Sequence, residues 1–417
     1  MTITDYRMMI LTIGNTMKSP LFLCLALIGF VACQTDSTVS EEIILLNTHE
    51  AVKTKKDLKL SDIAESIEFV KLETSPDCLI SGGRYVVGKK YIVFLNRKPE
   101  KVMLFDRSGK YLREIGRVGK GPGEFERPTY IDLSPDEDRI LVESVSFPSI
   151  ILEFSIDGNF IRSAELSNRS ENGVYYLGND QFIFMQGRHY TDSANYPRIV
   201  ALDQDLSHPT TLYSIDHKRN PDRMAGYFTR SLFSRLKSGF NFKDSMYDTV
   251  YYVNETLRPV PKYVIVEGEN TPPYYSMTRE ESDAYLDNVD MVNDLADYLL
   301  LLGQVNGKRV HLAYHKTTGE FFALKKQSEC LGIHSYSYGL VDDLTGMKPY
   351  WMWESADLRN NTLQELLNVI DLKDVIETDC FNNDERLIST KYRDALRVIV
   401  ESSSEEDNPI IRIIHLK

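Results

Sequence analysis

Short apolar segments separated by polar turns dominate the chain from about residue 58 to its end. The segment 102–113 (VMLFDRSGKYLR) aligns with 151–162 (ILEFSIDGNFIR), and matched residues are 49 positions apart throughout. Both segments contain a glycine at the turn, Gly109 and Gly158, followed two positions later by an aromatic residue. Each segment therefore predicts an apolar strand, a turn in which glycine can adopt a positive φ, and a second strand.

Two further strands are predicted before each of the early hairpins. They are 85–88 with 91–95, 131–133 with 139–142, and 174–177 with 181–185. Four strands per unit, at a period of about 45–50 residues, are typical of a β-propeller blade.

Looser copies of the hairpin follow, ending in the strand 410–416. They are 198–215, 248–266 and 309–324. We predict an all-β fold, a six-bladed β-propeller of four-stranded antiparallel blades over residues 58–417, with seven blades as the alternative. The strand 66–72 is expected beside 410–416, where it would close the ring and remove the exposed edges.

Short helical insertions are predicted in the later blades. The pattern Thr278-Arg-Glu-Glu281 is a capping box before an amphipathic run over 279–294. A second capping box, Thr362-Leu-Gln-Glu365, precedes the apolar sequence LLNVI.

The N-terminus has the pattern of an export signal. An apolar run of about 13 residues, PLFLCLALIGFVA, ends at Ala32 and is followed by Cys33. This run is short for a membrane span and has the length of a secretory signal core. We predict a signal peptide over 1–32, with Met17 as a possible true start, and a flexible tether over 33–57. The end of the run resembles a bacterial lipobox, which implies that Cys33 is lipidated; an ordinary signal peptide with an incidental cysteine is the alternative.

Charge and cysteine content narrow the classes of function. The formal net charge is −13 over 417 residues, which argues against a nucleic-acid binder and against adhesion to an anionic membrane through protein charge. The five cysteines form no Cys-x-x-Cys pair and no cluster with histidine, so we expect no zinc module and no disulfide framework. We expect no metal and no cofactor, and membrane contact only through the lipid anchor.

Residues 105–131 resemble one NHL repeat. The matching residues are Phe105-Asp-Arg-Ser-Gly109, the glycine-rich stretch from Gly116 through Phe125 to Pro128, and Ile131. With the lipobox, the sequence ESIEFVKLET (65–74) and the strand DTVYYV (248–253), the chain resembles the six-bladed β-propeller lipoproteins of Bacteroidetes. The resemblance implies the fold over residues 58–417 and a place at the outer membrane, on its periplasmic or its surface face. It implies no activity.

Several motifs are better explained by structure than by chemistry. GKGPGEF (119–125) lacks the ending and the helix of a phosphate-binding loop, so we interpret it as a connection between blades. Its structural residues would be Gly119, Gly121, Gly123, Phe125 and the nearby Pro128, alongside the turn residues Gly109 and Gly158. Asp342-Asp343 is interpreted as a turn or solvated position rather than a metal site, because adjacent strand residues point to opposite faces.

Candidate ligand-binding residues occur in two aromatic segments. His334, Tyr336 and Tyr338 alternate and could line a central channel, while Trp351 and Trp353 share one face if their segment is a strand. Aromatic faces can stack on sugars, although core packing between blades is the alternative for each segment. No catalytic residue is predicted, because no nucleophile or metal-binding motif is present.

These features favour a binding module held at the cell envelope. The ligand would be a glycan, a peptide or an envelope protein, bound by irregular loops such as 187–197, 216–247 and 268–304, and the protein is expected to be a monomer. One alternative is a propeller lyase or hydrolase acting on a glycan or peptide, which would need converging side chains with perturbed pKa values. Another is an assembly scaffold without a small ligand, which would present a large apolar patch.

Overall fold

The structure is a computed structural model. It describes residues 43–417 except for these positions: 147, 167–168, 178–180, 188–192, 218–231, 245–246, 255, 267–287, 307, 328–338 and 349–357. The chain divides into two compact units, Met1–Glu41 and Glu42–Lys417, and the second unit contains every described element. Within the described ranges, no helix is long and apolar enough to cross a lipid bilayer.

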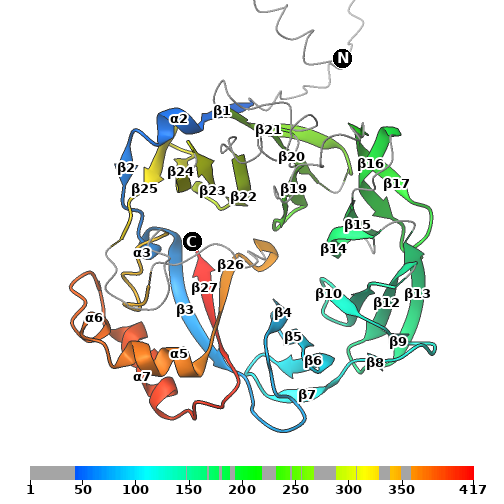
Figure 1. Ribbon diagram of the computed structural model, residues 1–417, viewed down its shortest axis with the longest axis horizontal. Coiled ribbons are helices and arrows are strands. Elements are labelled where there is room, and N and C mark those ends of the chain that lie inside the picture. The colour runs from blue at the N-terminus through cyan, green and yellow to red at the C-terminus, as the bar shows by residue number, and fades with distance from the viewer. Residues whose placement is uncertain are drawn as a thin grey trace, which may run out of the picture. The chain divides into compact units, whose positions relative to one another are not determined.

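The described residues form six blades in a ring, as the sequence predicts (Figure 1). Blades 1 to 3 are four-stranded, and their strands are numbered from the centre outward. Blade 1 contains β4 (Gly83–Val87), β5 (Tyr91–Arg97), β6 (Glu100–Asp106) and β7 (Tyr111–Glu114). Blade 2 contains β10 (Pro128–Leu133), β11 (Arg139–Ser144), β12 (Ser149–Ser155) and β13 (Phe160–Leu166). Blade 3 contains β14 (Ser170–Leu177), β15 (Gln181–Gln186), β16 (Ser193–Leu202) and β17 (Thr210–His217).

The later blades each include strands from the N-terminal segment of the propeller. Blade 4 contains β18 (Leu232–Arg235), β19 (Phe240–Lys243), β20 (Thr249–Val253), β21 (Pro259–Val266) and β1 (Ile44–Asn47). Blade 5 contains β22 (Asn288–Asp294), β23 (Tyr298–Val305), β24 (Lys308–His315), β25 (Glu320–Leu324) and β2 (Lys55–Lys56). Blade 6 contains β26 (Thr362–Leu367), β27 (Ile410–Leu416) and β3 (Ala64–Lys71).

The remaining elements connect the blades or decorate blade 6. They are the helices α2 (Thr48–Ala51), α3 (Leu60–Ile63), η2 (Leu358–Asn360), α5 (Val369–Ile376), α6 (Asp379–Asn382) and α7 (Lys391–Glu401), and the strand pair β8 (Arg117–Val118) and β9 (Glu124–Phe125). Helices α5 to α7 lie between β26 and β27 and form one group at the edge of the ring (Figure 1).

The predicted ring closure is confirmed. β3 pairs antiparallel with β27, from Lys71 opposite Ile410 to Ser66 opposite His415. Alternate residues of both strands enter the cores on either side, so the first and last parts of the propeller share one sheet. This pairing covers the edge that β27 would otherwise expose.

The predicted flexible tether over 33–57 is corrected at its C-terminal end. Residues Ile44–Asn47 pair in parallel with β21, and Lys55–Lys56 pair in parallel with β25. Leu46 and Ala51 are buried in the core shared with blades 4 and 5. The sequence IILLN supplies the apolar residues for this pairing, which outweighs the polar character of the residues around it.

Helical insertions do occur in a later blade, as α5 to α7 between β26 and β27 of blade 6, but neither predicted helix start is confirmed where the structure describes it. Residues 288–294, the end of the predicted helix over 279–294, form the strand β22, and the rest of that range lies outside the described residues. Thr362–Leu367 is the strand β26 rather than a capping box, and it pairs with β27 along its whole length. The helix begins only at Val369. In both places the pairing with a neighbouring strand overrides a short local helix pattern.

The paired acids Asp342 and Asp343 lie at a turn, as expected, but they are not solvated. Both side chains are fully buried. Asp342 accepts hydrogen bonds from Arg412 and Thr345, and Asp343 accepts one of 2.6 Å from Ser61 Oγ. They therefore fasten the segment before blade 6 to β27 and to α3.

Candidate functional site

The sequence-predicted ligand residues cannot be placed from the described part of the chain. His334, Tyr336, Tyr338, Trp351 and Trp353 all lie outside the described residues, as does Cys33. Their proposed roles stay predictions.

The residues given structural roles occupy turns and the core. Gly109 and Gly158 have φ values of 90° and 85° in the turns that follow β6 and β12. Gly123 has a φ of 75°, and Phe125 is fully buried with its ring 6.5 Å from that of Phe154. The segment 119–125 connects blade 1 to blade 2, with β8 and β9 paired in parallel across it. Gly119 and Gly121 lie close to the Glu124 side chain, and Pro128 begins β10.

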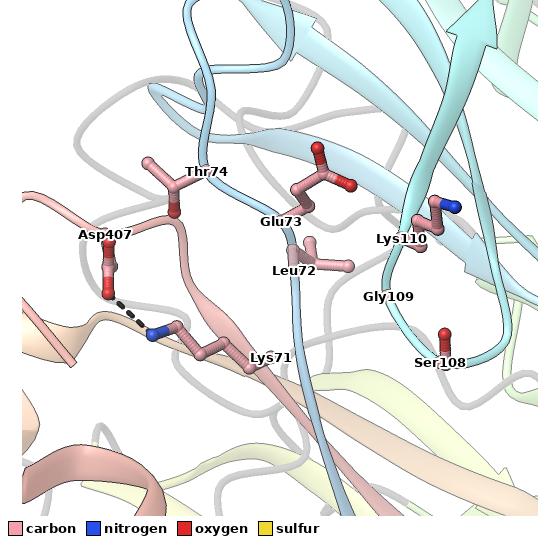
Figure 2. A pocket seen from close by; sticks show the side chains of 8 residues that line it. All are labelled: Lys71, Leu72, Glu73, Thr74, Ser108, Gly109, Lys110 and Asp407. Atoms are coloured by element: carbon pink, nitrogen blue, oxygen red, sulfur yellow. Dashed lines mark hydrogen bonds and ion pairs between the residues drawn. The ribbon is translucent and has the colours of Figure 1, made fainter. Parts of the chain in front are cut away.

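A shallow pocket of about 400 Å³ lies where blade 6 meets blade 1 (Figure 2). Its lining consists of Lys71, Leu72, Glu73, Thr74, Ser108, Gly109, Lys110 and Asp407. Three of its four charged groups already have partners within the protein. Lys71 Nζ lies 2.6 Å from Asp407, and Glu73 accepts a hydrogen bond from the Tyr111 amide. The hydrogen bond from Lys71 holds the pKa of Asp407 below its usual value. The pocket is lined by residues that join the first and last parts of the propeller, and these contacts account for its charged groups.

A second cluster lies along the inner strands, at the ring axis. Asp132 on β10 accepts two hydrogen bonds from Arg235 on β18, at 2.6 and 2.8 Å, and one of 3.3 Å from Arg359 in η2. The carboxylate of Asp132 is fully buried, and the Arg235 side chain is 9% exposed. Blade 3 separates blades 2 and 4, so this contact joins two blades that are not neighbours at the inner side of the ring. We call Asp132, Arg235 and Arg359 the axial triad.

Aromatic rings form a stacked column beside the axial triad. The Arg235 guanidinium lies 4.8 Å from the centroid of Tyr175, whose ring stacks on Phe233 at 4.9 Å. Phe233 in turn stacks on Phe240 at 4.7 Å. Burial raises the pKa of Tyr175, so its phenol stays neutral. The contacts along this column leave little ring surface for stacking on a ligand.

Another group of side chains lies nearer the first residues of the inner strands. Tyr130 precedes Asp132 by two residues on β10, so the two side chains share a face and are about 7 Å apart along the strand. The guanidinium of Arg84, on β4, lies 4.2 Å from the Tyr130 ring centroid. Gly173 on β14 approaches the same ring so closely that an added Cβ would lie 2.8 Å from it. The Tyr130 hydroxyl donates to the Glu171 carbonyl at 2.8 Å, so the ring is fixed on several sides.

A buried carboxyl and a second arginine complete this group. Glu143 on β11 is 1% exposed, and its Oε2 accepts a 2.6 Å hydrogen bond from Ser170 Oγ. Its Oε1 has no partner among the residues the structure describes. Burial raises the pKa of Glu143, and the Ser170 hydrogen bond together with Arg169 and Arg84 opposes the shift only in part. We call Arg84, Tyr130, Glu143 and Arg169 the rim cluster.

The two arginines of the rim cluster differ from most others in the propeller. Both side chains are exposed, and neither has a carboxylate partner within the described ranges. By contrast, Arg198 and Arg412 are fully buried, and each is held by two acids. The rim cluster is therefore a place where positive charge is available to a ligand.

Sequence reasoning did not find either cluster. A signal was present, because Arg84, Asp132 and Arg235 are charged residues within or at an end of short apolar strands. Nothing in the sequence, however, shows that Asp132 and Arg235 meet, since they are 103 residues apart on blades that are not adjacent.

Comparison with known proteins identifies a family. The sequence model for the domain of unknown function DUF4934 matches residues 43–415. The chain belongs to the DUF4934 family. The match begins at the residue before β1, which agrees with the inclusion of that strand in the propeller. A search of curated proteins finds no match.

Solved structures with similar folds include proteins from Bacteroides and from Staphylococcus. A protein from Bacteroides fragilis NCTC 9343 described as exported is 19% identical, with a TM-score of 0.59 over 90% of this chain and 100% of that chain. A DUF4221 protein from Bacteroides vulgatus is 13% identical, with a TM-score of 0.42 over 62% of this chain and 84% of that one. Virginiamycin B lyase from Staphylococcus aureus is 13% identical, with a TM-score of 0.38 over 63% and 75%. The first likeness supports the fold, and the other two are too distant to carry an argument.

Proposed function

We propose that this DUF4934 protein is a binding module that takes its ligand at the rim cluster. The observation that supports it is the pair of exposed arginines, Arg84 and Arg169, beside the inner strands and without carboxylate partners in the described part of the chain. A charged group left unpaired on a rigid scaffold is typical of a recognition site. The axial triad supplies that rigidity, because it ties blades 2 and 4 to the start of blade 6.

Binding accounts for the rim cluster better than catalysis does. A buried carboxyl with a raised pKa, such as Glu143, resembles a general acid. Its Oε1 has almost no accessible surface, however, and its Oε2 is held by Ser170. A catalytic acid must lie within hydrogen-bond reach of its substrate, and this carboxyl does not meet that requirement.

The protein is proposed to act at the cell envelope as a monomeric lipoprotein anchored through Cys33. Three features support this: the lipobox-like end of the signal segment, the similar fold of an exported Bacteroides protein, and the disulfide bond of Cys380, which the cysteine pattern of the sequence did not predict. Disulfides persist in oxidising compartments outside the cytoplasm. The ligand would be a glycan, a peptide or an envelope protein. For a glycan, the predicted aromatic platform is Trp351 and Trp353.

Hydroxyl-radical footprinting tests the proposed site on the purified full chain. Glycans and peptides are first screened for a saturable rise in melting temperature, and each hit is then footprinted. We expect a ligand to lower the labelling of half-buried Tyr130 and to leave Phe160, which is 40% exposed on the outer strand β13, unchanged. A ligand that leaves Tyr130 labelling unchanged would place the site elsewhere. Failure of every ligand to bind would instead favour the scaffold alternative.

The proposed anchor is tested separately by Cys33→Ser. We expect this variant to leave the membrane fraction for the soluble fraction on cell fractionation, because the thioether to lipid can no longer form. Cys78→Ser is the matched control, since Cys78 is buried and free. Continued membrane association of Cys33→Ser would refute the lipid anchor.

A further inference from the structure

We propose that the rim cluster recognises an oxyanionic group, a carboxylate or a phosphate, on its ligand. This inference rests on the proposed function and names the chemistry of the same site. It does not follow from the overall charge, which at −13 would disfavour an anion. It follows from how charge is distributed between the axis and the rim.

The rim cluster has hydrogen-bond donors available to a ligand. Ion pairs occupy most arginines of the regular blades: Arg107 with Glu68, Arg113 with Asp157, Arg139 and Arg162 with Glu153. At the rim, Arg84 and Arg169 have no such partner among the described residues. Each guanidinium has five N–H donors and no acceptor, so an oxyanion is the group that satisfies it best.

The Arg84 side chain is preorganised for binding. The Arg84 guanidinium lies over Tyr130, and that ring is held by the Glu171 carbonyl on one side and approached by Gly173 on another. A guanidinium stacked on an aromatic face keeps its N–H edge directed outward, where it can form two parallel hydrogen bonds to a carboxylate or phosphate. Ordering the side chain in advance reduces the entropy lost on binding.

The nearby acid, Glu143, does not neutralise these arginines. Glu143 is buried and turned to Ser170, so neither of its oxygens lies within hydrogen-bond distance of Arg84 or Arg169. Tyr130 and Ser170 beside it are uncharged, and Glu171, the other acid near Tyr130, is paired with Arg198 at 2.6 Å. The rim cluster therefore retains net positive charge, whereas the axial triad shares its two guanidiniums with one carboxylate.

Neutral sugar stacking is less well supported at this site. One face of Tyr130 is occupied by Arg84, and Tyr175 and Phe233 are stacked between other groups. A ligand at the rim would therefore make its strongest contacts through charge.

The test uses three probes that differ in charge: sodium D-glucuronate, D-glucose 1-phosphate and D-glucose. Binding to the full chain is measured by titration calorimetry at low and at high salt. We expect both anions to bind more tightly than glucose, and Arg84→Met to weaken their binding about tenfold or more, as for a lost charge-assisted hydrogen bond. Arg84→Lys should weaken it less, because the charge remains and only the planar fork is lost. Added salt should weaken binding by the wild type.

The matched control is Arg117→Met. Arg117 lies in the connection between blades 1 and 2 with 77% of its side chain exposed, and we expect its loss to leave binding of the anions unchanged. Circular dichroism and melting temperature establish that each variant is folded. Whether glucuronate or glucose 1-phosphate binds more tightly decides between a carboxylate and a phosphate.

The outcomes separate this inference from the proposed function. If the anions bind equally to wild type and Arg84→Met, or bind no better than glucose, the inference is wrong. If in that case a neutral ligand still protects Tyr130 in footprinting, the proposed binding function stands without the anion. If no ligand protects Tyr130, the proposed function fails as well.

Discussion

The axial triad and the rim cluster contain the same charged groups in opposite arrangements. Each has two arginines and one buried carboxyl. In the axial triad the carboxylate of Asp132 receives both guanidiniums, and the three groups are largely withdrawn from water. In the rim cluster the carboxyl of Glu143 turns to Ser170, and both arginines stay exposed.

The difference shows that position in the fold, and not composition, sets the role of a charge. Asp132 lies two residues beyond Tyr130 on β10. At this level the inner strands of blades 2 and 4 come within hydrogen-bond reach of each other. Charges paired there contribute to the integrity of the ring. Arg84 and Arg169, which lie nearer the first residues of the inner strands, have no carboxylate partner among the described residues and can contribute to recognition.

The largest expected effect comes from breaking the axial triad. Asp132→Ala leaves two arginines beside the axis without their carboxylate, and also removes the acceptor of the Tyr176 amide. We expect a loss of about 3–5 kcal/mol in the free energy of unfolding, the cost of an uncompensated buried charge. Urea denaturation of the full chain measures it.

Asp157→Ala is the control for Asp132→Ala. The Asp157 side chain is 70% exposed and pairs only at the surface with Arg113, so the expected change is within about 0.5 kcal/mol. Equal effects of the two substitutions would show that the triad adds nothing beyond a surface ion pair.

A smaller effect is expected from the rim carboxyl, and it depends on pH. Because burial raises the pKa of Glu143 in the folded state, the folded protein binds this proton more tightly than the unfolded chain does. Stability should therefore fall as the pH rises from the unfolded pKa of about 4.3 through the raised folded value. Glu143→Gln should lack this component, so its stability relative to wild type should rise between pH 4 and pH 8.

The control for Glu143→Gln is Glu126→Gln at an exposed position, measured in the same pH series. A pH profile of Glu143→Gln that parallels that of wild type would show that the buried carboxyl titrates normally. The rim would then carry a full negative charge, which would weaken the contrast with the triad.

The smallest effect on stability is expected from Arg84→Met. Its main contact is the stacking on Tyr130, worth about 0.5–1 kcal/mol at an exposed site. Thermal unfolding should therefore resemble that of wild type even though anion binding is weakened. A destabilisation as large as that of Asp132→Ala would make Arg84 a structural residue.

The sequence predicts most of the fold because each blade repeats a local pattern. The turns at Gly109 and Gly158, 49 residues apart, identify the period, and the strand 410–416 has its partner at 66–72, as the structure confirms. Predictions failed where a short segment had two local interpretations. Thr362–Glu365 has the pattern of a capping box, yet pairing with β27 makes it a strand.

The candidate site was not predictable for a different reason. Its contacts join residues from different blades, such as Arg84 with Tyr130 and Asp132 with Arg235, and no periodicity relates them. Sequence patterns identified the aromatic segments around Tyr336 and Trp351, which the structure leaves outside the described residues. The polar residues of the inner strands become meaningful only once the ring brings them together.

The route of the N-terminal segment has a mechanical consequence. Between Ile44 and Lys71 the chain adds β1 to blade 4, β2 to blade 5 and β3 to blade 6 in turn. A pull on the chain upstream of Ile44 would therefore act first on four residues of one blade, then on two of the next, and only last on the eight-residue strand that closes the ring. Tension applied there would separate β1 from β21 and β2 from β25 before it reached the pairing of β3 with β27. The ring would therefore stay closed under a load that had already detached β1.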